Sequence, residues 1–474
     1  MKFRVDEVVG ATRGRLAAGR RQASAGAVST DSRALAAGQT FLAIRGERFD
    51  GHDFLEGAVA RGAACLVVDR EDKVPAAAAA SGAAVVVVKD TLAALADLGR
   101  AARGRLTCPV MAVTGSCGKT TVKEMVGQIL LRRLRGRRPP ASFNNQVGVP
   151  LTLLAAEEDD QFVLCEFGTN APGEIALHAS VARPTIGIVT VVGKVHVEGL
   201  GSIEGVAREK AALVEALGPE GVAILNADDP RVALMAGRCR GRVVTVGLYA
   251  NADLQGADVV QTERAISFTA GDIGFEVPVL GEHHVLLALA AAAAAREVGV
   301  PLEESAAALR EFQPPPGRLH VERRGGVTVV DDAFNANPLS VRAALAQLRL
   351  WPERRKVFFA GDMRELGADS PAEHEALGPA IVEAGVSRLI CVGPESRVTA
   401  AAARAAGMRE ENVSAVEDAA AAAAMVPSVV RDGDVVLVKG SHAIHMERVV
   451  EALLKRDIPL SEGGLPVPSR ARTG

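Results

Sequence analysis

Cysteine is scarce in this 474-residue sequence, and the six cysteines show neither C-x-x-C spacing nor the rhythm of a disulfide framework. That pattern favours a reducing compartment. Long hydrophobic runs are also missing, because the longest one, residues 285–295, stops at Arg296 and is far shorter than a membrane span. The first residues, MKFRVDEVVGATRGRL, lack the apolar core of a signal peptide. We therefore expect a cytoplasmic protein that does not insert into a membrane.

A strong net charge is absent as well. The formal net charge is -3, so the chain has no overall field that could hold a polyanion, and nucleic acid is not an expected partner. The basic cluster from Arg132 to Arg138 is interpreted as a helix end leading into a solvated loop. Aromatic residues make up only 3%, which we attribute to a compositional habit rather than to function. With 48% hydrophobic and 23% charged residues, the chain should fold into about three globular domains.

Short apolar runs alternate with helical patterns along most of the chain, as in VMAVT (110–114), FVLCEF (162–167) and DVVLVKG (434–440). This alternation predicts α/β domains with buried parallel strands. Two segments interrupt it: the polar helix end before Pro109, and QPPPG at 313–317, which can continue neither a helix nor a strand. We therefore predict domains at residues 1–106, 107–312 and 313–474, with a loose tail over 461–474.

A phosphate-binding loop is predicted after the strand PVMAVT, where the turn GSCGKTT leads into the helix VKEMVGQILL. Backbone N–H groups of such a turn and the positive end of the helix surround phosphate oxygens. Val113 stands where the standard loop has its first glycine, so this is the shorter T-G-x-x-G-K-T variant. The loop predicts an enzyme that uses ATP, although switches, transport ATPases and ligases all contain such loops. Its residues are Thr114, Gly115, Ser116, Cys117, Gly118, Lys119, Thr120 and Thr121.

Three polar residues downstream bear on the same site. Glu166 ends the strand FVLCEF and places a carboxylate at the C-terminal edge of the parallel sheet, where α/β proteins bind ligands. His196 follows the next buried strand, and Lys210 lies on the helix after it. Taken singly, these two are more often a satisfied loop histidine and a solvated helix lysine. Their combination with the loop favours a ligand site.

At this point the sequence resembles the Mur ligases, specifically the MurF type, which adds D-alanyl-D-alanine to a UDP-muramoyl tripeptide. The resembling motifs are TGSCGKTTVKE, SFNNQVGVPLTLL, EFGTNAPGEI, HVEGLGSIEGVAREK, NADDP, DDAFNANP, GDMRELG and KGS, together with the N-terminal segment TDSRALAAGQTFLAIRGERFDGHDF. They cover nearly the whole chain in order. The resemblance implies an N-terminal α/β uridine-nucleotide-binding domain, a central P-loop ATPase-like domain with a parallel sheet, and a C-terminal Rossmann-like α/β domain.

The resemblance also implies a reaction, in which a substrate carboxylate attacks the γ-phosphate of ATP and an amine then attacks the acyl phosphate. Because two anions must meet, cations have to hold them together. By similarity, Lys119 and one Mg²⁺ ion, ligated by Thr120 and Glu166, serve the β- and γ-phosphates, while His196 ligates a second Mg²⁺. Lys210 matches the family lysine that CO₂ converts into a carbamate for orienting Mg²⁺, and an unmodified lysine is the alternative. Further nucleotide contacts are implied for Asn226, Arg318, Asp331 and Asp332.

For the two substrates, the resemblance implies separate sets of residues. The uridine diphosphate end of the acceptor is assigned to Thr30, Asp31, Ser32, Arg33, Asp50 and His52, with Asn144 and Asn145 at the sugar or pyrophosphate. The dipeptide is assigned to Asp362, Glu365, Lys439, Ser441 and Glu447. Two positions depart from the family pattern: Leu287 replaces an asparagine that contacts adenine, and His442 replaces the arginine after KGS. Since Leu287 cannot form that hydrogen bond, the contact is expected to pass to Asn226, the backbone or water.

Other functions remain open on the sequence alone. Another Mur ligase or a folylpolyglutamate-type ligase would share the chemistry but add a single amino acid. A P-loop switch protein would hydrolyse ATP slowly, and a silent relative would act only as an interaction protein. The sequence does not distinguish lysine from diaminopimelate as the third residue of the acceptor peptide. We expect the enzyme to be a monomer.

Overall fold

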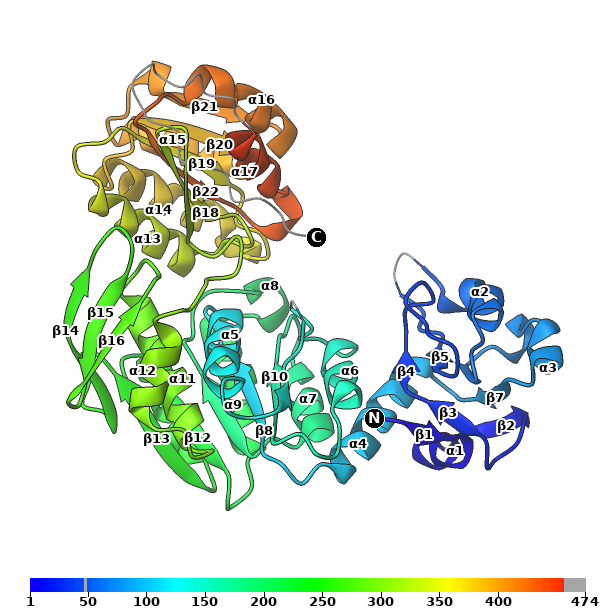
Figure 1. Ribbon diagram of the computed structural model, residues 1–474. Coiled ribbons are helices and arrows are strands. Elements are labelled where there is room, and N and C mark those ends of the chain that lie inside the picture. Colours follow the sequence, from blue (N-terminus) through cyan, green and yellow to red (C-terminus); the bar gives the residue numbers. More distant parts are fainter. Residues whose placement is uncertain (47–48, 141, 456–474) are drawn as a thin grey trace, which may run out of the picture. The chain divides into compact units, whose positions relative to one another are not determined.

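The computed structural model describes residues 1–46, 49–140 and 142–455, so the predicted loose tail lies outside the described residues. The α/β class is confirmed, since helices flank three large sheets (Figure 1). The chain forms two compact units. One holds the described residues of 1–260, 266–278 and 282–312, and the other holds residues 261–265, 279–281 and 313–455. The finer division at residues 106 and 312 stays a prediction.

The N-terminal part of the larger unit contains a five-stranded sheet in the order β2-β7-β6-β5-β4, parallel except for the β2–β7 pair. Its strands are β2 (Arg15–Ala18), β4 (Val28–Ser29), β5 (Thr40–Leu42), β6 (Cys65–Val68) and β7 (Ala84–Val87), and β1 (Phe3–Arg4) pairs separately with β3 (Ser24–Gly26). The helices are α1 (Val5–Thr12), α2 (Leu55–Ala60), α3 (Ala77–Ser81) and α4 (Thr91–Arg105). Helix α4 begins where the Asp90 carboxylate accepts a hydrogen bond from the Ala93 N–H at 2.8 Å.

The rest of this unit is built on a nine-stranded sheet in the order β16-β15-β14-β13-β12-β11-β8-β10-β9. Its strands are β8 (Val110–Thr114), β9 (Gly136–Arg137), β10 (Phe162–Glu166), β11 (Ile186–Val189), β12 (Val222–Asn226), β13 (Arg242–Gly247), β14 (Leu254–Gln261), β15 (Ile266–Ala270) and β16 (Ile273–Val277). The helices are α5 (Lys119–Leu130), α6 (Gly148–Ala155), α7 (Glu174–Ala182), α8 (Val197–Leu200), α9 (Ile203–Glu215), α10 (Pro230–Ala233), α11 (His283–Arg296) and α12 (Leu302–Leu309).

The register of the parallel strands brings the candidate site residues to one edge. Glu166 at the end of β10 pairs with Val113 of β8, and Thr114 of β8 pairs with Val189 of β11. All residues of β8 are buried, as are those of β10 and β11, because helices cover both faces of the sheet. The turns that follow these three strands therefore start side by side.

One hydrophobic core links the two sheets of the larger unit through α4. The core includes Leu95 and Leu98 of α4 together with Val149 of α6 and Val181 of α7. Gly99 allows the close approach, because a Cβ atom there would lie only 3.0 Å from Pro150. The N-terminal sheet is thereby packed against the helix that follows the Asn144–Asn145 segment.

The smaller unit contains a six-stranded sheet in the order β17-β18-β22-β19-β20-β21, parallel except for the β17–β18 pair. Alternation along the strands decides which face each residue covers: Phe358 belongs to the core on one face and Phe359 to the core on the other. The elements are β17 (His320–Arg324), β18 (Val327–Asp332), β19 (Lys356–Gly361), β20 (Arg388–Val392), β21 (Val413–Val416), β22 (Val435–Lys439), α13 (Pro338–Gln347), α14 (Ser370–Glu383), α15 (Ser396–Ala405), α16 (Ala419–Val429) and α17 (Glu447–Leu454).

The long apolar run of the sequence forms α11, whose residues from 287 to 295 are all buried. This helix packs against α5, which explains its apolar character as that of a core helix. Within the part of the chain that the structure describes, no helix is both long and apolar enough to cross a membrane.

Candidate active site

In the turn between β8 and α5, two positions have positive φ angles, which favour glycine. Gly115 has a φ of 151°, and Gly118, which caps the N-terminus of α5, has a φ of 81°. A Cβ atom on Gly115 would lie 1.8 Å from Thr190 Oγ1, and one on Gly118 would lie 2.7 Å from Leu287 Cδ2. Both separations are too short for non-bonded atoms. The turn therefore has the geometry of an anion-binding loop at a helix N-terminus.

Replacing Gly115 by alanine is expected to weaken nucleotide binding by at least about tenfold, because the methyl group overlaps the Thr190 hydroxyl and strains the loop. Gly10→Ala on α1 is the matched control, since nothing lies within 4 Å of its Cβ position. That change should leave binding unaltered and slightly raise the melting temperature. Titration of both variants with a fluorescent ATP analogue measures the effect, and parental affinity in Gly115→Ala would contradict the role of the loop.

Side-chain hydrogen bonds tie the phosphate loop to the segment after β11. Ser116 Oγ donates to the Gly193 carbonyl at 3.1 Å and accepts from the Gly193 N–H at 2.9 Å. Thr190 Oγ1 donates to the Cys117 carbonyl at 2.5 Å. The segment that leads to His196 is thus held beside the loop.

Lys119 and Thr120 direct their polar groups to different partners. Lys119 Nζ donates to the Gly115 carbonyl at 2.8 Å, so the ammonium group lies over the turn. Thr120 is buried, and its Oγ1 donates to Glu166 Oε1 at 3.2 Å. Asn144 Nδ2 donates to the same carboxylate oxygen at 3.0 Å. Asn144, predicted at the sugar or pyrophosphate, therefore also holds the candidate metal ligand.

Glu166 has the features of a ligand for a hard cation. Its side chain is 1% exposed, and Oε2 accepts no hydrogen bond from any described residue but lies 3.5 Å from Lys123 Nζ. A buried carboxylate oxygen next to a threonine hydroxyl suits Mg²⁺, which prefers oxygen ligands. Across residues 1–46, 49–140 and 142–455, no three His, Cys, Asp or Glu residues cluster into a complete metal cage.

Lys210 is 1% exposed on α9, close to the phosphate loop. Burial, assisted by the nearby charge of Lys119, lowers the pKa of Lys210 to about 7. A large share of this amine is consequently neutral at physiological pH. No hydrogen bond or ion pair within the described residues engages its Nζ. The amine is therefore both buried and available for a further partner.

Glu209, the neighbour of Lys210, was not singled out from the sequence. Its two carboxylate oxygens accept hydrogen bonds from the N–H groups of Gly173 and Ile175, both at 2.7 Å. These bonds join α9 to the N-terminus of α7 and so to the loop after Glu166. The signal was present, because Glu209 stands in the motif HVEGLGSIEGVAREK, but a helix glutamate is usually solvated.

His196 is half-buried at the N-terminus of α8 and has a φ of 52°. Such a left-handed conformation is uncommon outside glycine and marks a residue held by its surroundings. Two residues in its helix turn are fixed as well: the N–H groups of Gly199 and Leu200 donate to the His196 carbonyl at 3.1 and 2.9 Å. This turn comes directly after the segment around Gly193, which Ser116 holds by hydrogen bonds.

Asn226 has both ends of its amide occupied by protein groups. Nδ2 donates to the Thr190 carbonyl at 2.9 Å, and Oδ1 accepts from the Asp228 N–H at 3.0 Å. The side chain therefore joins the ends of β11 and β12, and its adenine contact stays a prediction. Leu287 is buried against Gly118, so this departure from the family pattern forms part of the wall of the phosphate loop.

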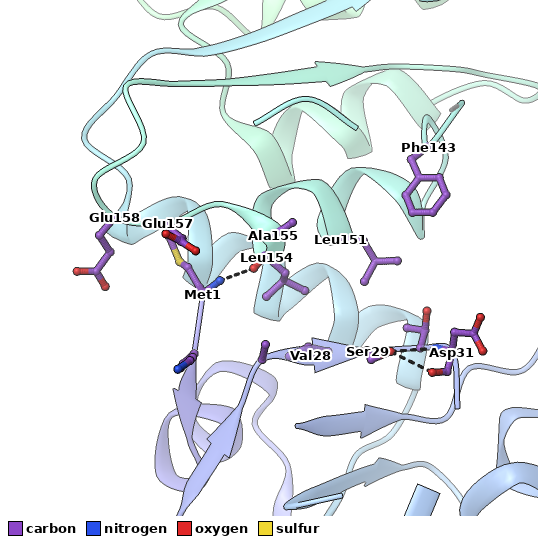
Figure 2. A pocket seen from close by; sticks show the side chains of 13 residues that line it. Met1, Val28, Ser29, Asp31, Phe143, Leu151, Leu154, Ala155, Glu157 and Glu158 are labelled. Carbon is purple, nitrogen blue, oxygen red and sulfur yellow. Dashed lines mark hydrogen bonds between the residues drawn. The ribbon is translucent and has the colours of Figure 1, made fainter. Parts of the chain in front are cut away.

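A cavity of about 880 Å³ lies within the larger unit where the N-terminal residues meet α6. Figure 2 shows Val28, Ser29 and Asp31 lining it together with Phe143 and Leu151. Its size lies in the range of small-molecule sites. Of the residues assigned to uridine diphosphate, Thr30 and Asp31 line the cavity.

The other residues predicted to bind the acceptor differ in their burial and in their hydrogen-bond partners. Arg33 pairs with Asp31 at 2.9 Å, and hydrogen bonding from Arg33 lowers the pKa of Asp31 to about 2. Ser32 follows Asp31 in the same partly exposed turn. His52 is instead buried, with Nδ1 only 2.6 Å from Asp50 Oδ1. Asn145 Oδ1 accepts hydrogen bonds at the start of α6 from the N–H groups of residues 147 and 148. His52, Asp50 and Asn145 thus serve local structure in this conformation.

In the smaller unit, two aspartates accept hydrogen bonds from the segment that follows the three prolines at 314–316. Asp331 Oδ2 accepts from the Gly317 N–H at 2.9 Å, and Asp332 Oδ1 accepts from the Leu319 N–H at 3.1 Å. Asp332 Oδ2 also pairs with Lys439 Nζ at 2.6 Å. Burial raises the pKa of both aspartates, and the Lys439 charge opposes that rise at Asp332. These groups hold the residues on both sides of Arg318.

Arg318 itself stacks on an aromatic ring. Its guanidinium carbon lies 4.2 Å from the centroid of Phe334, which also stacks on the exposed His442 at 5.5 Å. Stacking of this kind holds a guanidinium in one orientation. The sequence did not point to Phe334, because an aromatic residue in a motif does not reveal which side chain it contacts.

Among the dipeptide candidates, Asp362 is fully buried and Ser441 nearly so. Asp362 Oδ1 accepts from the Ser396 N–H at 2.8 Å, and Ser441 Oγ accepts from the Arg364 N–H at 2.8 Å. Arg364, which the sequence did not single out, is partly exposed and pairs with Asp362 at 3.1 Å. The candidate Glu447 is exposed and pairs with His445. The Arg364 guanidinium thus lies between the carboxylates of Asp362 and Glu395, and it pairs with Glu395 at 3.0 Å.

The basic cluster after α5 is neutralised by carboxylates. Its five arginines, Arg132, Arg133, Arg135, Arg137 and Arg138, all form ion pairs with glutamates or aspartates. Each of these charges is therefore partly offset by a carboxylate of the protein itself.

Three family models match the chain: the Mur ligase middle domain over residues 113–295, the Mur ligase glutamate ligase domain over 317–442, and the Mur ligase family catalytic domain over 25–103. Among curated proteins, the chain is 38% identical to UDP-N-acetylmuramoyl-tripeptide–D-alanyl-D-alanine ligase of Mycobacterium tuberculosis, with 91% of this chain and 92% of the relative covered. It is 36% identical to the Escherichia coli protein of the same name, with 90% and 93% covered.

Solved structures give the same result. MurF from Acinetobacter baumannii superposes with a TM-score of 0.86 at 30% identity, covering 96% of this chain and 99% of the other. MurF from Thermotoga maritima in complex with ADP superposes with a TM-score of 0.78 at 26% identity, covering 90% and 97%. The predicted resemblance is therefore confirmed, and this chain belongs to the Mur ligase family.

Proposed function

We propose that this protein is an ATP-dependent ligase that joins D-alanyl-D-alanine to UDP-N-acetylmuramoyl tripeptide in peptidoglycan precursor synthesis, forming ADP and phosphate. The observation that carries the proposal is the convergence of the glycine loop, the buried Glu166 carboxylate and the buried Lys210 amine at one edge of the central sheet. The names of relatives that match over nine tenths of their length support the substrates.

The geometry suits a reaction between two anions. A peptide carboxylate must approach the γ-phosphate of ATP, and Lys119 with the N-terminus of α5 offsets their repulsion. Thr120 and Glu166 would hold Mg²⁺ on the phosphates, and His196 would hold a second ion. Bound Mg²⁺ supplies charge neutralisation and alignment of the phosphate oxygens. The amine of the dipeptide then displaces phosphate from the acyl phosphate, which closes the amide bond.

Lys210 is proposed to react with CO₂. Only the neutral form of an amine attacks CO₂, and the pKa of about 7 provides that form at neutral pH. A buried ammonium beside Lys119 is unfavourable, whereas a carbamate would be attracted to Lys119 and to Mg²⁺. The modified side chain would then orient the metal ion on its long stem.

The uridine diphosphate end of the acceptor and the dipeptide are proposed to bind in different units of the protein. The cavity of Figure 2, with Thr30 and Asp31 in its lining, would take the uridine diphosphate end of the acceptor. In the smaller unit, Arg364 would contact the carboxylate of D-alanyl-D-alanine, because its guanidinium is partly exposed and is held in place by Asp362 and Glu395. We also propose a monomeric, cytoplasmic enzyme.

A coupled phosphate-release assay tests the function. Phosphate should appear only when ATP, UDP-muramoyl tripeptide and D-alanyl-D-alanine are all present. Single amino acids and glutamate in place of the dipeptide should give no product, which separates this activity from that of other Mur and folylpolyglutamate-type ligases. Equal phosphate release without acceptor and dipeptide would contradict the proposal and identify a plain ATPase. Comparison of lysine- and diaminopimelate-containing tripeptides in the same assay identifies the preferred acceptor.

A further inference from the structure

Lys123 is a fully buried lysine, one turn after Thr120 on α5, and the reaction described above does not use it. Its Nζ lies 3.5 Å from Glu166 Oε2 and 3.2 Å from Glu124 Oε1. Burial of a charged side chain is costly unless opposite charges compensate it. The carboxylates of Glu166 and Glu124 therefore compensate the charge of the buried Lys123 ammonium.

Beyond Lys123, negatively and positively charged side chains continue to alternate. Glu124 forms an ion pair with Arg138 through its second oxygen. Gly127 of α5 makes room for this arginine, since a Cβ atom there would lie 2.6 Å from Arg138 Cδ. Glu166, Lys123, Glu124 and Arg138 together carry two negative and two positive charges. The net charge of these four side chains is therefore zero when no metal ion is bound.

The two oxygens of Glu166 have different surroundings. Oε1 accepts hydrogen bonds from Thr120 and Asn144, while Oε2 accepts none from the described residues and faces Lys123. A metal ion on this carboxylate would lie only a few ångströms from the Lys123 ammonium. Two cations at that separation repel each other strongly in a buried environment.

We propose that Lys123 is a positioning residue that sets the order of binding at the metal site. Its ammonium balances Glu166 in the free enzyme, so the site binds a divalent cation weakly until the phosphates of a nucleotide add negative charge. Lys123 thereby couples metal binding to nucleotide binding and keeps Glu166 fixed beside Thr120 in the meantime. This inference rests on the proposed role of Glu166 as a metal ligand.

The test measures Mn²⁺ binding to the full-length protein without nucleotide, from the electron paramagnetic resonance signal of free Mn²⁺ at pH 8. Lys123→Met should bind Mn²⁺ about tenfold more tightly than the parent, because a nearby positive charge is lost. Glu124→Gln should bind about threefold more weakly, because the lost Glu124 charge no longer offsets the Lys123 ammonium beside the metal site. Lys123→Arg, which keeps the charge, should resemble the parent.

The opposite signs make the test specific, since simple structural damage would weaken binding in both variants. Circular dichroism melts establish that each variant folds, and Glu124→Gln, at a partly exposed position, gives a result even if Lys123→Met does not fold. Parental Mn²⁺ affinity in both variants, or weaker binding in both, would overturn the proposal. Glu166→Gln distinguishes failure of this inference from failure of the proposed metal site. If Glu166→Gln binds Mn²⁺·ATP as tightly as the parent, Glu166 is not a metal ligand. If Glu166→Gln loses that binding but Lys123→Met binds Mn²⁺ like the parent, only the inference about Lys123 is refuted.

Discussion

Replacement of Lys119 by alanine is expected to lower the rate of ligation by about a thousandfold or more while leaving the fold intact. The ammonium group lies over the phosphate loop, 2.8 Å from the Gly115 carbonyl, where it would follow the γ-phosphate as charge develops. The side chain is only partly buried, so its removal leaves no core cavity and should barely change the melting temperature.

The measurement is the steady-state rate of phosphate release with all three substrates, together with a thermal melt. Lys89→Ala, at an exposed position beyond β7, is the matched control and should keep the parental rate. Lys119→Arg retains the charge but not the compact shape of an ammonium group, so it should recover only part of the activity. An unchanged rate in Lys119→Ala would remove the phosphate loop from the mechanism.

Replacement of Lys210 by alanine is expected to reduce the rate by a factor of about a hundred or more, and short carboxylates such as acetate should restore part of it. The reason is that a carbamate on Lys210 would supply a carboxylate at this buried position beside the phosphate loop. The rescued rate should rise with carboxylate concentration and saturate. Lys210→Met, which fills the space without a functional group, should be inactive and show less rescue.

The chemistry of Lys210 can also be observed directly. With ¹³C-labelled CO₂, the parent should show a carbamate resonance that is absent in Lys210→Ala. Because the pKa is lowered to about 7, the neutral amine dominates above that pH and becomes a minor form about one unit below it. Carbamate formation and activity should therefore fall as the pH decreases from 8 to 6. Absence of the resonance at pH 8, combined with failure of rescue, would favour the unmodified lysine.

Sequence alone was sufficient for features that depend on neighbouring residues. The alternation of apolar runs and helical patterns predicted the α/β class, and the motifs predicted the family, both of which are confirmed. The order of strand, glycine turn and helix placed the phosphate loop at residues 114–121, and the structure gives Gly115 and Gly118 the positive φ angles that such a loop needs. Local spacing carries this information because the loop is continuous in the chain.

Tertiary structure decided what each side chain contacts and how far it is buried. Taken singly, a helix lysine such as Lys210 is more often solvated, yet Lys210 is buried near Lys119. Lys123, which the sequence did not single out, is buried beside Glu166 of another element. Asp362, predicted at the dipeptide, is fully buried and pairs with the partly exposed Arg364. Burial and pKa depend on strands and helices that are distant in the chain. Only the folded arrangement brings those elements together, which is why motif spacing predicted a site but could not determine its electrostatics.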